Sequence, residues 1–303
     1  MSITVRNLTK KYGKFTALDD VSVSISNGCV GLLGPNGSGK STFIKTLLSL
    51  VSSTQGDVEI LGMDARKEAK KIRQKIGYMP EDDCFIPGIP GISAISFMGE
   101  LSGLSPMDSL GRAHEMCDFV GFKEERYRKT DTYSTGMKQK MKFAQALVHD
   151  PSIIFLDEPT NGLDPASRNR MLKLIKYLSK ECGKIIILCT HLLQDVEMVC
   201  DSAFILSSGK VLKEGTIADL TRPLDSSVTV KIKENFSEFE LGLKERNCVV
   251  EPIVAGEYKI TGDDARDHII EIAAQFKCSL IKVQGSKNSL ESVFLEAVQD
   301  GHN

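Results

Sequence analysis

A glycine-rich stretch, Gly34-Pro-Asn-Gly-Ser-Gly-Lys-Ser41, decides how this chain is expected to fold. It fits the pattern G-x-x-x-x-G-K-[ST]. It stands between a short apolar run at 29–33, typical of a strand, and a helical stripe of apolar residues from 42 to 51. Average amino-acid usage gives roughly 0.01–0.02 accidental matches in a chain of this length. A plain glycine-rich turn is therefore the weaker interpretation, and the strand–loop–helix order predicts a loop that binds phosphate.

The loop also predicts roles for its residues. Its glycines allow successive backbone N–H groups to point at phosphate oxygens, and the N-terminus of the following helix adds partial positive charge. We expect the Lys40 ammonium to reach the β- and γ-phosphates and to stabilise charge during catalysis, and the Ser41 hydroxyl to hold Mg²⁺. The expected nucleotide-binding residues of this segment are Gly34, Pro35, Asn36, Gly37, Ser38, Gly39, Lys40, Ser41 and Thr42.

The composition describes a globular chain with balanced charge. The 303 residues carry 38 Lys and Arg against 40 Asp and Glu, a formal net charge of -2, and 41% of them are hydrophobic. This balance argues against a whole surface that binds nucleic acid or anionic lipid, and the hydrophobic content excludes general disorder. No run approaches 18 apolar residues and the start lacks a secretory pattern, so we expect no membrane span and a cytosolic location. The 8 scattered cysteines show no metal-ligand spacing.

Two patterns divide the chain into two predicted domains. Over residues 1–222, short apolar runs alternate with helical periods, which indicates an α/β domain with a mostly parallel sheet. A turn-rich segment at 221–227 leads to residues 223–303, where strand and helix signals follow the order β-α-β-β-α-β before a last helix near 290–298. This order predicts a small ferredoxin-like α+β module.

A pair of carboxylates ends a buried apolar run. Asp157 and Glu158 follow Ile153-Ile-Phe-Leu156, and ligands in open α/β sheets collect at the carboxyl ends of strands. We expect Asp157 to take part in Mg²⁺ binding and Glu158 to polarise an attacking water. A solvated acidic pair at a strand end is the alternative, and the phosphate loop upstream weakens it.

A third segment lies between these two, and with it the chain resembles a known family. Tyr133-Ser-Thr-Gly-Met-Lys138 leads into a predicted helix at about 136–149. In their order along the chain, the three segments make residues 2–220 similar to the ATPase subunits of ATP-binding-cassette (ABC) transporters. That family usually has L-S-G-G-Q in the third segment, from which Tyr133, Thr135 and Lys138 depart. The divergent form resembles the subunits of multidrug, sodium, haem and gliding-type exporters.

The resemblance implies further site residues. Ser134 and Gly136 would contact ATP bound by an opposite subunit, as a second helix N-terminus directed at phosphate. Tyr12 stands where the family stacks an aromatic ring on adenine, although an exposed turn tyrosine is the plainer interpretation. Asp164 lies near the expected dimer interface and is also a predicted helix N-cap. His191 stands where the family senses the γ-phosphate, against the plainer interpretation of a structural histidine.

One catalytic position departs from the family's pattern. Glu81 ends Ile76-Gly-Tyr-Met-Pro-Glu81, where the family usually has Gln. A carboxylate accepts hydrogen bonds but offers no amide donor. We expect Glu81 to hold Mg²⁺ or water at the catalytic site. The stretch that follows, 82–104, contains apolar residues that we expect to be exposed and to contact a partner.

The resemblance implies a fold class and a function. The fold would be an α/β P-loop NTPase cassette, with a mostly parallel core sheet, an antiparallel β subdomain and a helical subdomain, followed by the C-terminal module. ATP and Mg²⁺ would be the cofactors. Two copies would dimerise head to tail around ATP and drive a separate transmembrane permease, of the exporter type, from the cytoplasmic face of the inner membrane. We expect no nucleic-acid partner, because the basic run at 66–75 has no interleaved aromatic residues.

Other functions share some of these motifs. A soluble ABC-type ATPase of translation or DNA repair is the main alternative, but such proteins usually carry two cassettes or long coiled coils, and this sequence has one phosphate loop and no sustained heptads. A P-loop GTPase would need an N-K-x-D segment, which the sequence lacks. A non-catalytic regulatory module is disfavoured because Lys40, Glu158 and His191 are all present.

Overall fold

The chain folds into two compact units. The computed structural model describes residues 2–222, 227–233, 236–254, 256–262, 264–276, 278–285 and 289–300. One unit comprises Met1–Ile217 with Phe294–Asn303, and the other comprises Ala218–Val293. The predicted domain division after residue 222 stays a prediction, and residues 223–226 of the predicted linker lie outside the described part. Among the described residues, no helix combines the length and the apolarity that crossing a membrane requires.

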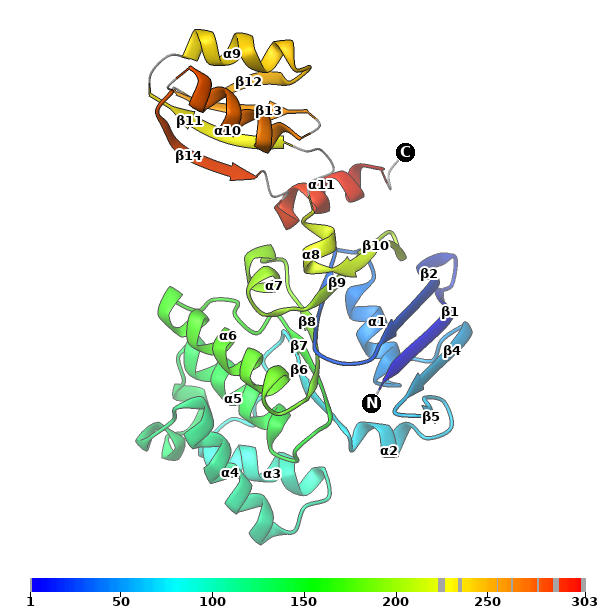
Figure 1. Cartoon of the computed structure of the whole chain (residues 1–303). Coiled ribbons are helices and arrows are strands. Elements are labelled where there is room, and N and C mark those ends of the chain that lie inside the picture. Colours follow the sequence, from blue (N-terminus) through cyan, green and yellow to red (C-terminus); the bar gives the residue numbers. More distant parts are fainter. Residues whose placement is uncertain are drawn as a thin grey trace. The chain divides into compact units, whose positions relative to one another are not determined.

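A six-stranded sheet forms the centre of the first unit (Figure 1). In spatial order it consists of β10 (Lys210–Thr216), β9 (Ser202–Ser207), β3 (Cys29–Leu33), β8 (Ile185–Cys189), β7 (Ile153–Asp157) and β6 (Ile76–Met79). All neighbours pair in parallel except β10 and β9. Every residue of β3, β7 and β8 is buried, as is usual for parallel strands that are covered on both faces.

A second, antiparallel sheet belongs to the same unit. Its order is β2 (Phe15–Ile25), β1 (Ile3–Tyr12), β4 (Gln55–Ile60) and β5 (Met63–Asp64). Helix α1 (Lys40–Leu47) joins the two sheets in one core, where the rings of Phe43 and Phe204 meet edge to face with centroids 5.6 Å apart. The sequence predicted an apolar helical stripe up to residue 51. The helix ends at Leu47 instead, since Ser49 adopts a left-handed backbone with φ 55°.

Helices occupy the chain between β6 and β7, and further helices precede and follow β8 in the sequence. The first group is α3 (Gly91–Leu101), α4 (Pro106–Val120), the 3-10 turns η1 (Glu124–Tyr127) and η2 (Thr130–Thr132), and α5 (Thr135–Leu147). The others in this unit are α2 (Ala69–Arg73), α6 (Pro165–Lys180), α7 (Leu193–Val199) and the start of α8 (Ile217–Leu220). Asp164 caps α6, as predicted, and Pro165 is the first residue of that helix. The basic side chains at 66–75 are exposed, but only α2 within that run is helical.

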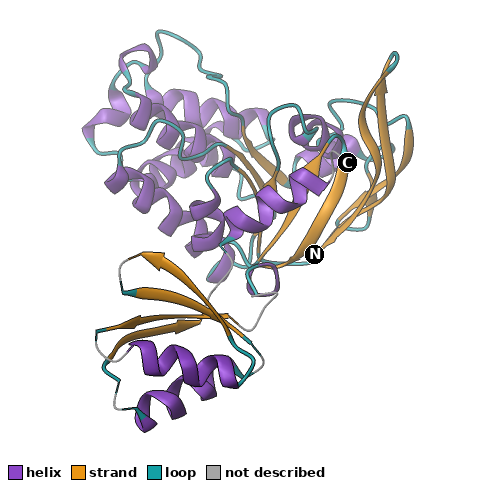
Figure 2. Cartoon of the chain, turned by 90° about the horizontal axis from the view of Figure 1, so that it is seen from above, coloured by secondary structure: helices purple, strands orange, loops and turns teal. Residues whose placement is uncertain are grey.

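The second unit is a ferredoxin-like module, as its element order predicted. Its elements are β11 (Ser227–Ile232), α9 (Phe236–Glu245), β12 (Val249–Val254), β13 (Glu257–Thr261), α10 (Ala265–Gln275) and β14 (Leu280–Gly285). The sheet order is β12-β13-β11-β14, and all pairs are antiparallel. Helices α9 and α10 lie on one face of the sheet, over Val228, Val230 and Ile260 (Figure 2). The last helix, α11 (Leu290–Asp300), begins in this unit and ends in the other.

Candidate functional site

The ends of several strands open into one cleft of about 670 Å³ in the first unit. Strands β3, β6, β7 and β8 run parallel, so the segments that follow them meet at the same edge of the sheet. The structure therefore gathers residues that are far apart in the sequence. The predicted residues that line the cleft are Gly34, Pro35, Asn36, Gly37, Gly39, Lys40, Ser41, Thr42, Glu81, Asp157, Glu158 and His191.

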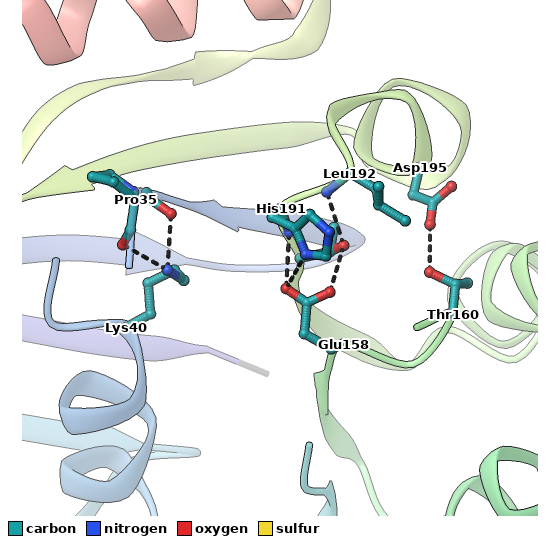
Figure 3. A network of polar contacts seen from close by, with 9 residues as sticks. Pro35, Lys40, Glu158, Thr160, His191, Leu192 and Asp195 are labelled. Carbon is teal, nitrogen blue, oxygen red and sulfur yellow. Dashed lines mark hydrogen bonds and ion pairs between the residues drawn. The ribbon is translucent and has the colours of Figure 1, made fainter. Parts of the chain in front are cut away.

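The phosphate loop is shaped by glycines and ends at a positively charged side chain, that of Lys40. A Cβ at Gly34 or at Gly39 would lie 2.2 Å or 2.6 Å from a backbone carbonyl oxygen, so neither position accepts a larger side chain. Gly39 also has a left-handed φ of 108°. Lys40 Nζ donates to the carbonyl oxygens of Gly34 (2.8 Å) and Pro35 (3.0 Å), as Figure 3 shows. Together with the N-terminus of α1, this ammonium makes one wall of the cleft positive.

Glu158 is held by the segment that follows β8. Its Oε1 accepts a hydrogen bond from the His191 backbone N–H (2.9 Å) and lies 2.9 Å from His191 Nδ1, and its Oε2 accepts from Thr190 Oγ1 (3.1 Å) (Figure 3). An ionised carboxylate can only accept, so a hydrogen bond between these two groups requires the tautomer of His191 with its proton on Nδ1. Glu158 has a left-handed φ of 48°, a conformation that its surroundings must hold. Backbone and hydrogen bonds together fix this carboxylate at the end of β7.

The carboxylates of Glu81, Asp157 and Glu158 give the cleft a surplus of negative charge over the ammonium of Lys40. Burial raises the pKa of Asp157; a hydrogen bond with Cys189 opposes this rise, and the nearby charges of Glu81 and Glu158 add to it. A divalent cation would relieve this repulsion, and the oxygens of Ser41, Asp157 and Glu81 are donors that Mg²⁺ prefers. The described residues contain no group of three or more His, Cys, Asp or Glu side chains able to hold a metal. The donors therefore fit a Mg²⁺ that takes further ligands from phosphates and water.

The loop that carries Glu81 is held by helix α5. Lys142 is 2% exposed, and its Nζ donates to the carbonyl oxygens of Pro80 (3.0 Å) and Glu81 (2.7 Å). Burial lowers the pKa of this ammonium. One turn earlier, Lys138 Nζ forms an ion pair of 2.5 Å with Asp83. The carboxylate of Glu81 is exposed, so this residue is positioned through its backbone.

Some predicted residues do not line the cleft. Tyr12 is 47% exposed, and the Lys10 ammonium lies 4.7 Å from its ring centroid. Phe15, three residues later, lines the cleft instead. Ser38 is a buried residue of the loop, and its Oγ has no hydrogen-bond partner among the described residues. The stacking role of Tyr12 stays a prediction.

Ser134, Gly136 and Asp164 also lie outside the cleft wall, at the N-termini of two helices. Ser134 Oγ accepts from the Met137 N–H at the start of α5 (3.4 Å), and Asp164 Oδ1 accepts from two N–H groups at the start of α6 (3.0 Å each). Ser134 is exposed, so the N-terminus of α5 is open to solvent. Tyr133, by contrast, is buried and donates through its hydroxyl to the Glu125 carbonyl oxygen, which makes it a packing residue.

Sequence reasoning missed several residues that shape the site. Thr190 was the most accessible to prediction, because it stands between a buried strand and His191. Phe15 lies in an alternating strand that gives no sign of a ligand. Lys142 and Asp195 are spaced as ordinary helix residues, and only the structure shows that both are buried with polar partners.

Comparison with known proteins agrees with this geometry. Residues 18–161 match the family model described as ABC transporter. The chain is 32% identical over 302 residues to the linearmycin resistance ATP-binding protein LnrL of Bacillus subtilis, covering 97% of each chain. It is 29% identical to the bacitracin transport ATP-binding protein BcrA of Bacillus licheniformis, covering 99% of this chain and 98% of that protein.

A solved structure supports the same assignment. A dimeric ATP-binding cassette in a post-hydrolysis state, bound to ADP and phosphate, superimposes with a TM-score of 0.66 at 28% identity. The match covers 71% of this chain and 98% of that one. The fold, the phosphate loop and the acidic strand end therefore lead to one conclusion. This chain belongs to the ABC transporter family, as an ATP-binding subunit that hydrolyses ATP.

Proposed function

We propose that this chain hydrolyses ATP at the described cleft to drive a separate membrane-spanning permease of the exporter type. The observation that carries the catalytic part is the placement of Glu158, fixed by Thr190 and His191, in the same cleft as Lys40. The exporter part rests on relatives such as those named for bacitracin transport and for Nod factor export. The chain would lie at the inner face of a membrane because it would be bound there to the proposed permease.

The residues of the cleft divide the chemistry among them. Lys40 and the loop N–H groups bind the β- and γ-phosphates and stabilise the charge that develops as the γ-phosphoryl group leaves. Glu158 orients the water that attacks the γ-phosphorus and takes its proton as the bond to the β-phosphate oxygen breaks. Ser41, Asp157 and Glu81 would hold Mg²⁺, which neutralises phosphate charge when bound.

His191 is suited to report on the γ-phosphate. Its backbone N–H and its ring both contact the Glu158 carboxylate, so the ring can turn toward phosphate while the backbone bond still holds Glu158. The His191 side chain is 61% exposed, which leaves it room to move. We therefore assign the sensing role to the ring and the holding role to the backbone.

A second copy would complete the site. The N-terminus of α5 is open to solvent at Ser134, and Gly136 lies in the first turn of that helix. Asp164 caps α6, and the resemblance to the family implies that this residue lies near the dimer interface. In the Glu158→Gln background, MgATP should convert the protein to a dimer, and Ser134→Arg should prevent this. Ser105 is the matched control because it also caps a helix, α4, through its Oγ. Dimers that survive Ser134→Arg as well as Ser105→Arg would exclude the head-to-tail arrangement.

Exposed apolar residues within 82–104 would form the surface that contacts the permease. Phe97 (41% exposed) and Leu101 (67%) lie four residues apart on α3 and hence on one face, while Ile92 and Ile95 are buried. Leu101→Asp should abolish co-purification with a multi-span membrane protein. Leu50→Asp changes another exposed leucine, after α1 (58%), and should leave co-purification intact. If the wild-type chain brings down ribosomes or DNA-repair proteins and no membrane protein, the transport assignment fails.

Among the residues of the C-terminal module that the structure describes, no recognisable site stands out. We infer that residues 223–303 form an accessory domain for dimer contact or regulation, with a simple packing extension as the alternative. Because α11 crosses the border between the units, two deletions are needed, 223–303 and 223–293. ATPase rates and dimerisation equal to those of the whole chain in both deletions would leave only the packing extension.

A further inference from the structure

A buried carboxylate outside the cleft wall connects the catalytic segments to one another. Asp195, on α7, is 1% exposed. Its Oδ2 accepts a hydrogen bond from Thr160 Oγ1 (2.6 Å), and its Oδ1 accepts from Arg168 Nε (2.6 Å) and pairs with Arg168 Nη2 (2.6 Å). Figure 3 shows the bond to Thr160 beside the contacts between Glu158 and His191.

The partners of Asp195 come from the segment that contains Glu158. Thr160 follows Glu158 by two residues and is itself buried, and Arg168 lies in the first turn of α6, four residues after its Asp164 cap. Asp195 follows His191 by four residues, and its own N–H donates to the Leu192 carbonyl oxygen. One side chain thus ties the start of α7, and with it His191, to the chain that leads from Glu158 to α6.

Packing alone does not require a charge at this position. Helix α7 already docks through Val196 and Val199, which are 0% and 3% exposed, and Val196 packs against β3 so closely that a Cβ at Gly31 would lie 2.6 Å from it. Replacing a buried ion pair with apolar residues is often neutral or stabilising. A buried carboxylate with two directional partners therefore serves position more than stability.

We propose that Asp195 is a positioning residue for ATP hydrolysis, which fixes His191 relative to Glu158 by bracing α7 against Thr160 and Arg168. The inference rests on the proposed roles of Glu158 and His191. Because Asp195 does not line the cleft, it affects turnover through geometry, and a misplacement of about 1 Å can cost a hundredfold in rate. ATP binding depends on the phosphate loop and is left intact.

The first test is Asp195→Asn, which keeps the side-chain volume and removes the charge. We expect the kcat per folded molecule to fall between about tenfold and a hundredfold, while the Kd for ATP stays within about threefold. Thr160→Val, which removes only the hydroxyl donor, should lower kcat in the same direction. The double variant should be no worse than Asp195→Asn alone, since both changes break one connection.

Asp150→Asn is the control for the loss of an ion pair away from the cleft. Asp150 also forms an ion pair, with Lys184 at 2.7 Å, but it precedes β7 and so lies at the opposite edge of the sheet. Its kcat should equal that of the wild type. If Asp195→Asn yields no folded protein, Thr160→Val against Asp150→Asn decides the question alone.

Several results would overturn the inference. A wild-type kcat per folded molecule in Asp195→Asn and Thr160→Val would exclude a positioning role. Parallel losses of ATP affinity, kcat and melting temperature would show that the role is structural. Multiplicative effects in the double variant would show that Asp195 does not act through Thr160. Glu158→Gln, assayed alongside, distinguishes a failure of the proposed catalytic role of Glu158 from a failure of the positioning role of Asp195. If Glu158→Gln turns over normally, the catalytic role fails. If it is inactive while Asp195→Asn is normal, only the positioning role fails.

Discussion

The end of β7 and the loop at 80–83 bring carboxylates to the same cleft by different means. The side chain of Glu158 is 10% exposed, and its two oxygens are held by Thr190 and His191. The carboxylate of Glu81 is exposed, and Lys142 holds only the backbone beside it. The first arrangement suits a group that must meet a reacting water at a defined distance. The second allows the side chain to adjust while the loop stays attached to α5.

This difference predicts that substitutions at the two places will have very different effects. The loop at 80–83 connects the cleft to α5, and Ser134 at the N-terminus of that helix is proposed to meet the nucleotide of a second copy. Changes at the β7 end should therefore affect chemistry, and changes at the loop should affect attachment and tuning.

The largest effect is expected for Glu158→Gln. An amide cannot take the proton of the attacking water, so kcat should fall by at least about a hundredfold. The Kd for ATP should remain within about threefold, measured by titration with a fluorescent nucleotide, with phosphate release giving kcat. Asp57→Asn, at a carboxylate whose side chain is 83% exposed, serves as control. Normal turnover in Glu158→Gln would remove Glu158 from the role of base.

Lys142→Met should have the next largest effect, on stability. It leaves the carbonyl oxygens of Pro80 and Glu81 without their donor, so the free energy of unfolding should fall by about 1–3 kcal/mol. Urea denaturation measures this change, and Lys173→Met, at an exposed lysine on α6, should stay within about 0.5 kcal/mol of the wild type. Equal stability of the two variants would mean that Lys142 does not hold the loop.

Glu81→Gln should change the rate little. The amide keeps an oxygen donor and removes one negative charge, so kcat should remain within about threefold, and the Mg²⁺ concentration for half-maximal activity should rise by a similar factor. A Mg²⁺ titration of ATPase activity provides both numbers. Complete loss of activity would show that the two side chains are not interchangeable here.

The smallest effect is expected for the pair of Asp83 and Lys138. The Lys138 side chain is 32% exposed and that of Asp83 51%, so solvent screens their attraction. A double-mutant cycle with Asp83→Asn and Lys138→Met should give a coupling energy of about 0.2–1 kcal/mol in the free energy of unfolding, smaller at high salt. A coupling above that range, unaffected by salt, would contradict the view of this contact as a solvated surface pair.

Local sequence patterns were sufficient for much of the fold. Apolar runs predicted β3 and β7, because strands buried on both faces require continuous apolar residues. The order of strand and helix signals predicted the C-terminal module. The end of α1 was not predictable, since the apolar stripe runs on past the left-handed Ser49. Boundaries depend on single backbone conformations that an apolar pattern does not encode.

Short motifs were enough to predict the chemistry of the cleft. A glycine loop with Lys40 and Ser41, and carboxylates at the end of an apolar strand, predict phosphate and cation binding because each motif carries its chemistry within a few consecutive residues. The contacts between motifs were decided by tertiary structure. That Phe15 lines the cleft, that Lys142 holds the loop of Glu81, and that Asp195 braces α7 are all relations between distant segments. Such relations depend on which side chains the packed sheet and helices bury together.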